Sequence, residues 1–407
     1  MSGITPEFIR AIPKSDLHLH LDGSLRIKTL IELAKEQNVE LPSYTEDGLR
    51  EIVFKERYDN LGEYLRGFGY TCQVLQKPEA LERVAYEVAV DSYTEGVRYF
   101  ETRLAPQLLI NEEMEMPTVL QAVHNGLDRA ATEFNSRPEV REGKEPRYGF
   151  GIIACAMRMF KKGFSRYFDN LLDVQAYAPE KKVFKIASLE MARAAVHMRD
   201  NMGLAIVGFD LAGQEYGYPA HTHVQAYHYA HRHFLRKSVH AGEAYGPESI
   251  FEAITDLHTD RIGHGFYLFS ADKIQNPAIK DRERFVEELA EYIADRRITI
   301  EICLTSNLQT NPALKDLSQH PLRKMLDAKI STTFCTDNRL VSRTSVSNEI
   351  EIAVKEMNLS PRQLRECIFN GFKRSFMPYS YLKKRDYVRK VIDYYSRLEK
   401  KMNVKKD

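Results

Sequence analysis

Cysteine is scarce in this chain, and its cysteines do not come in close pairs. The 407 residues include five cysteines, an odd number, and none of them forms a C-x-x-C pair. A disulfide framework needs a dense and usually even set of cysteines, so this pattern favours free thiols in a reducing compartment. We expect most of them in the core: Cys72, Cys155, Cys303, Cys335 and Cys367.

An excess of one charge and long apolar runs are missing too. Lys and Arg number 58 against 57 Asp and Glu, which gives a net charge of +1. Binders of nucleic acids or membrane surfaces usually carry a basic excess, so we expect neither partner and favour a small-molecule substrate. No window approaches the roughly 20 apolar residues that a membrane span needs. The first residues show no signal-peptide pattern, so we predict a cytoplasmic protein.

Short apolar runs recur along the chain, and longer stretches with helical spacing lie between them. Residues 78–96 have apolar side chains at three- and four-residue steps, and residues 281–297 form another such stretch. We interpret the apolar runs as eight strands, at residues 17–21, 97–104, 150–157, 205–211, 238–242, 261–266, 298–304 and 331–336.

The alternation of eight strands with helices predicts an α/β fold, a (β/α)8 TIM barrel. A doubly wound open sheet is the alternative, but no Gly-rich phosphate turn follows the first strand. No low-complexity segment or Gly/Ser linker interrupts the chain, so we expect one barrel domain over residues 1–407. The basic, amphipathic tail at 361–407 is interpreted as additional C-terminal helices that close the barrel, rather than as a calmodulin or membrane ligand.

The first predicted strand contains His18-Leu19-His20. Residues two apart in a strand point to the same side, so both imidazoles can enter the barrel interior and share one metal ion. The spacing is weak evidence alone, because His221-Thr222-His223 shares it. That second pair lies in a helical stretch, where residues two apart diverge, and we interpret it as part of a solvated helix face.

Other polar groups follow later predicted strands. His240 and Glu243 come after one strand, His264 after the next, and Asp337 with Asn338 after the last. In barrel enzymes the carboxyl ends of the strands carry the active site. Three imidazoles and a carboxylate suit Zn²⁺, although Fe²⁺ and Mn²⁺ bind similar sets. A metal with an open position lowers the pKa of a bound water, so the sequence predicts a metal-assisted hydrolysis.

Seven motifs in order resemble those of the adenosine deaminase family of metal-dependent barrel amidohydrolases. Together they run from the first predicted strand to the last, and NGFKRSFMP at 370–378 resembles the family's C-terminal helix. They are SDLHLHLDGSL (15–25), GVRYFETRLAP (96–106), VGFDLAGQE (207–215), VHAGE (239–243), RIGHG (261–265), EICLTSN (301–307) and CTDN (335–338).

The resemblance implies one zinc ion per chain, with His18, His20, His240 and Asp337 as its ligands. Barrel relatives with two metals often bridge them with a carboxylated lysine. The fourth predicted strand offers no lysine, which favours a single metal.

The resemblance also implies roles for side chains around the metal. Glu243 looks like the group that protonates purine N1, and His264 like the one that orients the attacking water and helps to deprotonate it. Asp22 resembles a partner of a ribose hydroxyl, and Gly213 the backbone donor to purine N3. His20 is implied as a substrate contact as well as a ligand.

Asn338 departs from the pattern of the better-known family members, which carry a second aspartate there. That aspartate contacts purine N7, and one of the two partners must carry a hydrogen. An amide NH₂ donates at any pH, so Asn338 can keep the contact. The departure resembles a bacterial branch of the family, and it affects the choice of substrate more than the reaction.

Two segments have an open role. Leu61, Tyr64, Leu65 and Phe68 resemble the family's apolar lid helix, but ordinary helix packing explains the same spacing equally well. Residues 158–195 are longer than a compact strand-to-helix connection. They could reshape the entrance for a nucleoside, but we expect a surface insertion without a role.

The predicted reaction is hydrolytic deamination of adenosine or 2′-deoxyadenosine to inosine or 2′-deoxyinosine, with release of ammonia. Adenine and a modified 6-aminopurine nucleoside are alternative substrates, although Asp22 favours a nucleoside over the free base. A nucleotide is disfavoured because no phosphate-binding cluster stands beside the motifs. A barrel amidohydrolase acting on a cyclic amide or phosphoester ranks lower, because the fourth predicted strand offers no bridging lysine. A non-catalytic metal-binding protein also ranks lower, because no expected catalytic group is lost.

Overall fold

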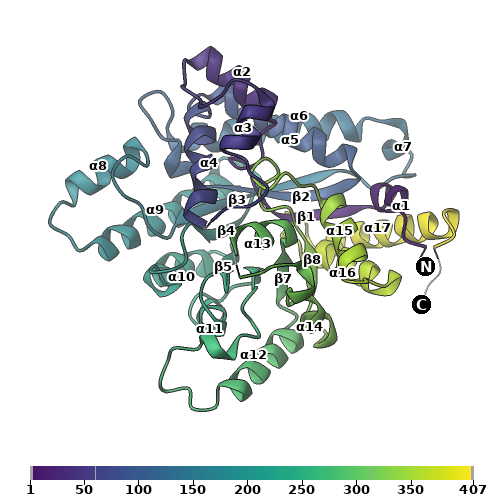
Figure 1. The fold of residues 1–407 in the computed structure, drawn as a ribbon. Helices are drawn as coiled ribbons and strands as arrows, with labels where there is room; N and C mark the ends of the chain where they lie inside the picture. The colour runs from purple at the N-terminus through teal and green to yellow at the C-terminus, as the bar shows by residue number, and fades with distance from the viewer. Residues whose placement is uncertain (1–2, 60, 312, 405–407) are drawn as a thin grey trace.

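Eight parallel strands surround the centre of the molecule in chain order (Figure 1). The computed structural model describes residues 3–59, 61–311 and 313–404. All eight predicted strands are confirmed, with small shifts at their ends. They are β1 (Lys14–His20), β2 (Val97–Leu104), β3 (Gly149–Met157), β4 (Ile206–Ala212), β5 (Arg236–Ala241), β6 (Arg261–His264), β7 (Thr299–Ile302) and β8 (Thr332–Phe334).

The barrel closes just beyond the end of β8. The main-chain N–H of His20 donates to the Asp337 oxygen, and the N–H of Asp337 donates to the His18 oxygen, both at 2.7 Å. The contact is a parallel bridge between Leu19 and Asp337. The (β/α)8 barrel is therefore confirmed, and an open doubly wound sheet is excluded by the sequential strand order.

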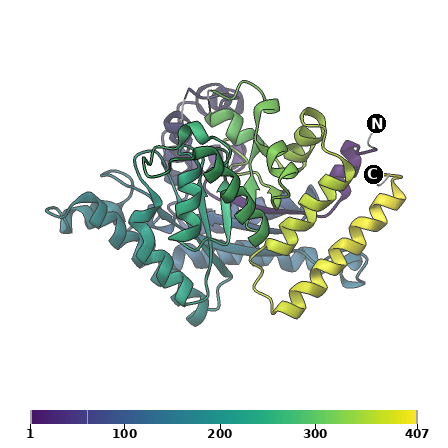
Figure 2. The same cartoon turned by 90° about the horizontal axis from the view of Figure 1, so that it is seen from below.

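Helices form a ring around the strands (Figures 1 and 2). Four short 3-10 helices join them: η1 (Pro106–Leu108), η2 (Ala220–His223), η3 (Ala271–Lys273) and η4 (Leu317–Gln319). The α-helices before the tail are α1 (Pro6–Ala11), α2 (Ile27–Gln37), α3 (Glu46–Ile52), α4 (Leu61–Val74), α5 (Pro78–Thr94), α6 (Met116–Asn135), α7 (Pro138–Arg141), α8 (Arg166–Val174), α9 (Glu180–Asn201), α10 (Val224–Arg232), α11 (Pro247–Thr255), α12 (Arg282–Arg296), α13 (Leu304–Thr310), α14 (Leu322–Asp327) and α15 (Val346–Glu356).

The helix predicted at 281–297 is confirmed as α12, and both of its ends are capped. α12 begins after Asp281, whose side chain accepts a hydrogen bond from the main-chain N–H of Arg284 at 3.0 Å. It ends at Arg297, which takes the left-handed conformation at φ 53°. These caps satisfy main-chain groups that a helix end leaves unpaired. The helix at 78–96 is confirmed as α5.

Two C-terminal helices complete the fold, as expected. α16 (Pro361–Arg374) and α17 (Tyr381–Lys401) lie side by side outside the strands (Figure 2). A Cβ at Gly371 would stand 2.0 Å from the Ser15 Oγ, so only glycine lets α16 approach β1 this closely. Tyr387 of α17 donates to the main-chain oxygen of Arg98 at 2.9 Å. Across the described residues, no helix has the length and apolarity to cross a membrane.

A buried network of charges fills the barrel beneath the strand ends. Arg103 donates to Asp210 at 2.8 Å and to Glu301 at 3.0 Å. Arg261 donates to Glu301 at 2.6 Å and to Glu101 at 2.5 Å. All five residues are fully buried. Charges this deep are tolerated only when they are paired and hydrogen-bonded, so the network fixes the strands that carry it.

Candidate active site

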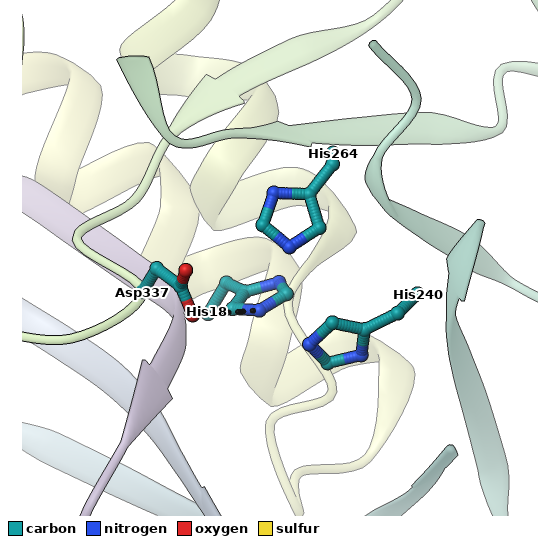
Figure 3. A group of neighbouring side chains, drawn as sticks. All are labelled: His18, His240, His264 and Asp337. Carbon is teal, nitrogen blue, oxygen red and sulfur yellow. Dashed lines mark ion pairs between the residues drawn. The ribbon is translucent and has the colours of Figure 1, made fainter. Parts of the chain in front are cut away.

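Four side chains from different strands turn toward one space at the carboxyl ends of the barrel (Figure 3). His18 comes from β1, His240 from β5, His264 from β6, and Asp337 follows β8. All are buried, and one ligand atom from each lies within 4.8 Å of the others. His264 and Asp337 take left-handed backbone at φ 66° and 59°. Such strained turns occur preferentially at functional sites, and here they aim both side chains inward.

His20 joins this group from β1. Its Nε2 lies 3.2 Å from the His240 Nε2 and 3.5 Å from the Asp337 Oδ1, and the His18 Nε2 also lies 3.5 Å from that oxygen. Tetrahedral ligands of one zinc ion stand about 3.4 Å apart. The buried His18 Nε2 has no hydrogen-bond partner within the described structure. Three of the six separations among these four donors therefore match those around one zinc ion.

Carboxylates stand behind two of these imidazoles. The His18 Nδ1 lies 2.7 Å from a Glu301 oxygen, and the His240 Nδ1 lies 3.1 Å from Asp210. Such partners hold the ring proton on Nδ1 and leave Nε2 free to bind a metal. Burial raises the pKa of Asp210, but the charges of His240 and Arg103 outweigh it and hold that pKa well below its ordinary value.

A chain of hydrogen bonds fixes the orientation of His264. The N–H of Leu322 donates to the His320 Nδ1 at 3.1 Å, so the proton of the neutral His320 ring is on Nε2 and donates to the Asn307 Oδ1 at 3.2 Å. Burial lowers the pKa of His320 to about 3, which keeps that ring neutral. The amide of Asn307 then donates to the His264 Nδ1 at 3.2 Å. A neutral His264 must carry its proton on Nε2.

Glu243 stands on the loop after β5. Its Oε1 lies 3.9 Å from the His264 Nε2, and its side chain is 11% exposed. It lines the same cavity as the candidate metal ligands. A carboxyl group here can exchange a proton with a molecule bound above the metal.

The three remaining candidate substrate contacts line the same cavity. Asp22 is buried, and burial raises its pKa to about 7. Gly213 directly follows β4 with φ 96°, and a Cβ there would stand 3.2 Å from the Met157 Cε. The amide of Asn338 donates to the hydroxyl of Tyr64 at 2.7 Å. The structure thus brings these three residues together with Glu243, His264 and the candidate metal ligands His20, His240 and Asp337 around one cavity.

The cavity has a volume of about 810 Å³ and two side walls. One wall is α4, which contributes Tyr64, Leu65 and Phe68; the side chain of Leu61 lies outside the described residues. The other wall belongs to the 158–195 segment, because residues 159, 161 and 163–165 line the cavity. This part of the segment therefore lies at the cavity, which favours the alternative that it shapes the entrance.

The profile of the adenosine deaminase family matches residues 13–394.

The chain belongs to the adenosine deaminase family.

Relatives by sequence carry the family name. "Adenosine deaminase 1" of Streptomyces coelicolor is 35% identical over 381 residues, which cover 92% of this chain and 85% of the relative. "Probable adenosine deaminase" of Dictyostelium discoideum is 32% identical over 375 residues, and the match spans only 42% of that longer protein.

Solved structures share the barrel. The N6-methyl-AMP deaminase of Arabidopsis thaliana has a TM-score of 0.70 at 25% identity, covering 96% of this chain and 98% of that chain. An amidohydrolase from Burkhoderia ambifaria, solved with bound Zn, has a TM-score of 0.75 at 19% identity, covering 99% of this chain and 96% of that chain. The second likeness shows the fold.

Within this adenosine deaminase family member, sequence reasoning missed the supporting groups. Glu301, Asp210 and Asn307 lie inside the motifs, but no role was assigned to them. A single charged residue in an otherwise apolar barrel strand was the available signal for the two carboxylates. No such signal was present for Asn307 and His320, because their partners come from other elements.

One expectation about the second H-x-H pair is wrong. His223 is fully buried rather than solvated, and burial lowers its pKa to about 3. Its Nε2 lies 3.2 Å from the main-chain oxygen of Arg158, and the Arg158 guanidinium donates to the main-chain oxygen of His240. His221 is exposed, as expected. The short 3-10 helix η2 turns the two rings apart, so they do not form a second metal site.

Proposed function

We propose that this chain hydrolyses the 6-amino group of adenosine or 2′-deoxyadenosine, giving inosine or 2′-deoxyinosine and ammonia. The observation that carries the proposal is the meeting of four imidazoles, from His18, His20, His240 and His264, with Asp337 and Glu243 at one cavity. Family membership supports the same reaction. A cytoplasmic location remains part of the proposal.

The proposed metal is one Zn²⁺ held by His18, His20, His240 and Asp337. The donor set and the separations of 3.2–3.5 Å support this choice. When bound, the ion would activate a water molecule for attack on purine C6. His264 lies close enough to serve as a ligand as well, but a proton on its Nε2 favours a role as a hydrogen-bond donor.

Glu243 and His264 supply the proton chemistry in this proposal. As oxygen attacks C6, negative charge develops on N1, and a protonated Glu243 transfers its proton there. The C6–O bond stays, and the C6–N bond breaks as the hydroxyl proton on the new oxygen passes to the amino nitrogen, which leaves as ammonia. The other proton of the consumed water molecule restores the Glu243 carboxyl group. His264 orients the attacking oxygen by donation from Nε2. Because Nε2 already carries a proton, this arrangement supports orientation rather than proton acceptance.

Three further residues would hold the nucleoside. Asp22 would pair with a ribose hydroxyl, and the main-chain N–H of Gly213 would donate to N3. Asn338 has two amide hydrogens and gives one of them to Tyr64. The second remains for purine N7, and His20 would contact the substrate beside the metal.

A larger 6-aminopurine substrate, either a modified nucleoside or a nucleotide, is a second candidate. A cavity of about 810 Å³ lies toward the upper end of the range for small-molecule pockets, which exceeds the needs of adenosine. Arg66 of α4 and Lys161 of the opposite wall both line it. These cations would suit an additional anionic group, and the Arabidopsis neighbour is named for an N6-methyl nucleotide.

Absorbance assays on adenosine, 2′-deoxyadenosine, adenine, N6-methyladenosine and AMP, combined with metal analysis, test the proposal. We expect turnover of a nucleoside and one zinc per chain. No turnover of any 6-aminopurine by the metal-loaded protein would overturn it. Preference for AMP would replace the leading substrate with the second candidate.

A pair of histidine substitutions tests the metal site. We expect His240→Ala to lose the metal, because one of four donors is removed. His221→Ala is the control, since His221 is an exposed histidine outside the proposed ligand set and contacts Asp256 at 3.3 Å. Equal metal content in the two variants would contradict the assignment.

A further inference from the structure

Glu215 is a buried carboxylate outside the cavity. It follows β4 by three residues and is fully buried, although its neighbours Gln214 and Tyr216 are exposed. It does not line the cavity, and none of the ion pairs found among the described residues includes it. A buried carboxylate without a cation must be stabilised by hydrogen bonds alone.

Consecutive main-chain N–H groups supply those hydrogen bonds. The loop of residues 242–245, called here the 242–245 loop, directs its N–H groups toward the Glu215 carboxylate. Such a run of N–H groups is an anion-binding arrangement in proteins, and here a side chain of the same chain fills it. Oε2 accepts from Glu243 at 3.1 Å, Ala244 at 2.6 Å and Tyr245 at 3.0 Å.

The second oxygen extends this contact to both ends of the loop. The Glu215 Oε1 accepts from the N–H of Gly242 at 3.0 Å and from the hydroxyl of Ser249 at 2.5 Å. Gly242 takes φ 70°, which turns the chain out of β5, and Ser249 belongs to α11. One carboxylate therefore fixes the whole connection from the end of β5 to α11.

A second contact joins the same two loops. The rings of Tyr216 and Tyr245 stack with centroids 5.5 Å apart. The hydroxyl of Tyr245 accepts from the main-chain N–H of Gly217 at 2.7 Å. The loop after β4 and the loop after β5 thus form one connected unit at the cavity mouth.

The geometry points to Glu215 as the positioning residue that sets Glu243 relative to the purine ring. Gly213, the proposed N3 donor, lies on the loop that carries Glu215, and Glu243, the proposed N1 donor, lies on the loop that Glu215 binds. N1 and N3 belong to one rigid ring, so the two loops must keep a fixed separation. This inference rests on the proposed function for its kinetic part only.

Hydrogen exchange of the substrate-free holoenzyme tests the structural part. In Glu215→Gln we expect the amides of the 242–245 loop to exchange about 10- to 100-fold faster, because an amide is a weaker acceptor and its NH₂ opposes the N–H groups. Glu248→Gln is the matched control. Glu248 of α11 accepts from the main-chain N–H groups of Gln275 and Asn276, both at 2.8 Å, away from the cavity. That variant should accelerate exchange at 275–276 and leave 242–245 unchanged.

Kinetics test the positioning part. For Glu215→Gln we expect kcat to fall about 10- to 100-fold at unchanged zinc content, since small misplacements of a catalytic group have effects of this size. A tetrahedral, 6-hydroxylated dihydropurine nucleoside should bind more weakly by the same factor, and inosine should bind within about threefold of wild type. A purely structural role would weaken both ligands alike or neither.

Ser249→Ala provides a milder variant if Glu215→Gln does not fold. It removes one donor to the Glu215 Oε1, and we expect about 3-fold faster exchange in the 242–245 loop with a similar fall in kcat. Unchanged exchange in both variants would overturn the inference. Faster exchange at wild-type kcat would overturn positioning while leaving the contact. A wild-type protein inactive on every 6-aminopurine would refute the proposed function instead, without altering the exchange result.

Discussion

Glu243 and His264 face each other at the cavity, with 3.9 Å between the Oε1 and Nε2 atoms. Neither residue is needed to complete the proposed set of four metal donors. The two side chains therefore offer a way to separate proton transfer from metal binding.

We predict that Glu243→Gln keeps its metal and loses turnover. Glutamine preserves the shape of the side chain but cannot donate an acidic proton to N1, so kcat should fall by about 10²–10⁴-fold. Metal analysis and the absorbance assay on one preparation measure both effects. Near-normal turnover would show that the proton comes from another group.

The environment of His264 leads to a second prediction at this scale. Asn307→Asp is isosteric, but a carboxylate only accepts hydrogen bonds, so it should draw the His264 proton from Nε2 to Nδ1. We expect the ¹⁵N NMR shifts of the ring to reverse and kcat to fall about 10-fold or more. Gln309→Glu, on the same helix α13, is the control that adds a charge without touching His264. An unchanged tautomer would contradict the hydrogen-bond chain.

At the scale of elements, the strand predictions were wrong mainly in where the strands end. The runs at 238–242 and 261–266 were expected to continue as strands, but β5 ends at Ala241 and β6 at His264. Gly242 and His264 have positive φ, which breaks the strand. Gly242, Gly265 and Phe266 are apolar and are buried or half-buried in these turns, so periodicity alone could not place the strand ends.

The wall formed by the 158–195 segment has a small apolar core of its own. Phe160 stacks on Phe168 with centroids 4.0 Å apart and meets Phe184 edge-on at 4.9 Å. This cluster lies between α8 and α9 and supports the residues that line the cavity.

We predict that Phe160→Ala loosens this wall and raises KM, with zinc content and kcat close to wild type. Loss of a buried aromatic ring costs about 3–5 kcal/mol where it is fully packed. Because the cluster is separate from the main core, limited proteolysis should cut first within residues 159–174. Val174→Ala, at an exposed position of α8, is the control. Equal proteolysis of both variants would rule out the supporting role.

At the scale of the whole molecule, one buried cation links two supports of the metal site. Arg103 pairs with Glu301 and Asp210, and these carboxylates contact His18 and His240. Barrel stability and metal binding therefore depend on the same residues.

We predict that Arg103→Met lowers the free energy of unfolding by about 3–5 kcal/mol, because it leaves the buried Asp210 without its guanidinium partner and Glu301 with Arg261 alone. Urea unfolding measures the change. Arg129→Met is the control, since its exposed pair with Glu82 at 2.8 Å should contribute about 1 kcal/mol or less. Similar decreases in the free energy of unfolding in both variants would show that the buried network contributes no more than an exposed ion pair.

The sequence by itself determined the barrel, the eight strands and the candidate ligands. Each depends on a local pattern: alternation of strands and helices, the H-x-H spacing in β1, and polar residues directly after apolar runs. These patterns can be recognised in the sequence because the period and the end of a strand are set within a few residues.

Only the tertiary structure decided which groups support those residues. The contact of His18 with Glu301 spans 283 positions, and that of His264 with Asn307 spans 43. The five hydrogen bonds of Glu215 join two loops that follow different strands. A charged residue in an apolar motif looks the same in the sequence whether or not the folded protein places a partner beside it. Strand register and loop packing determine that partner, and both are established only when the barrel closes.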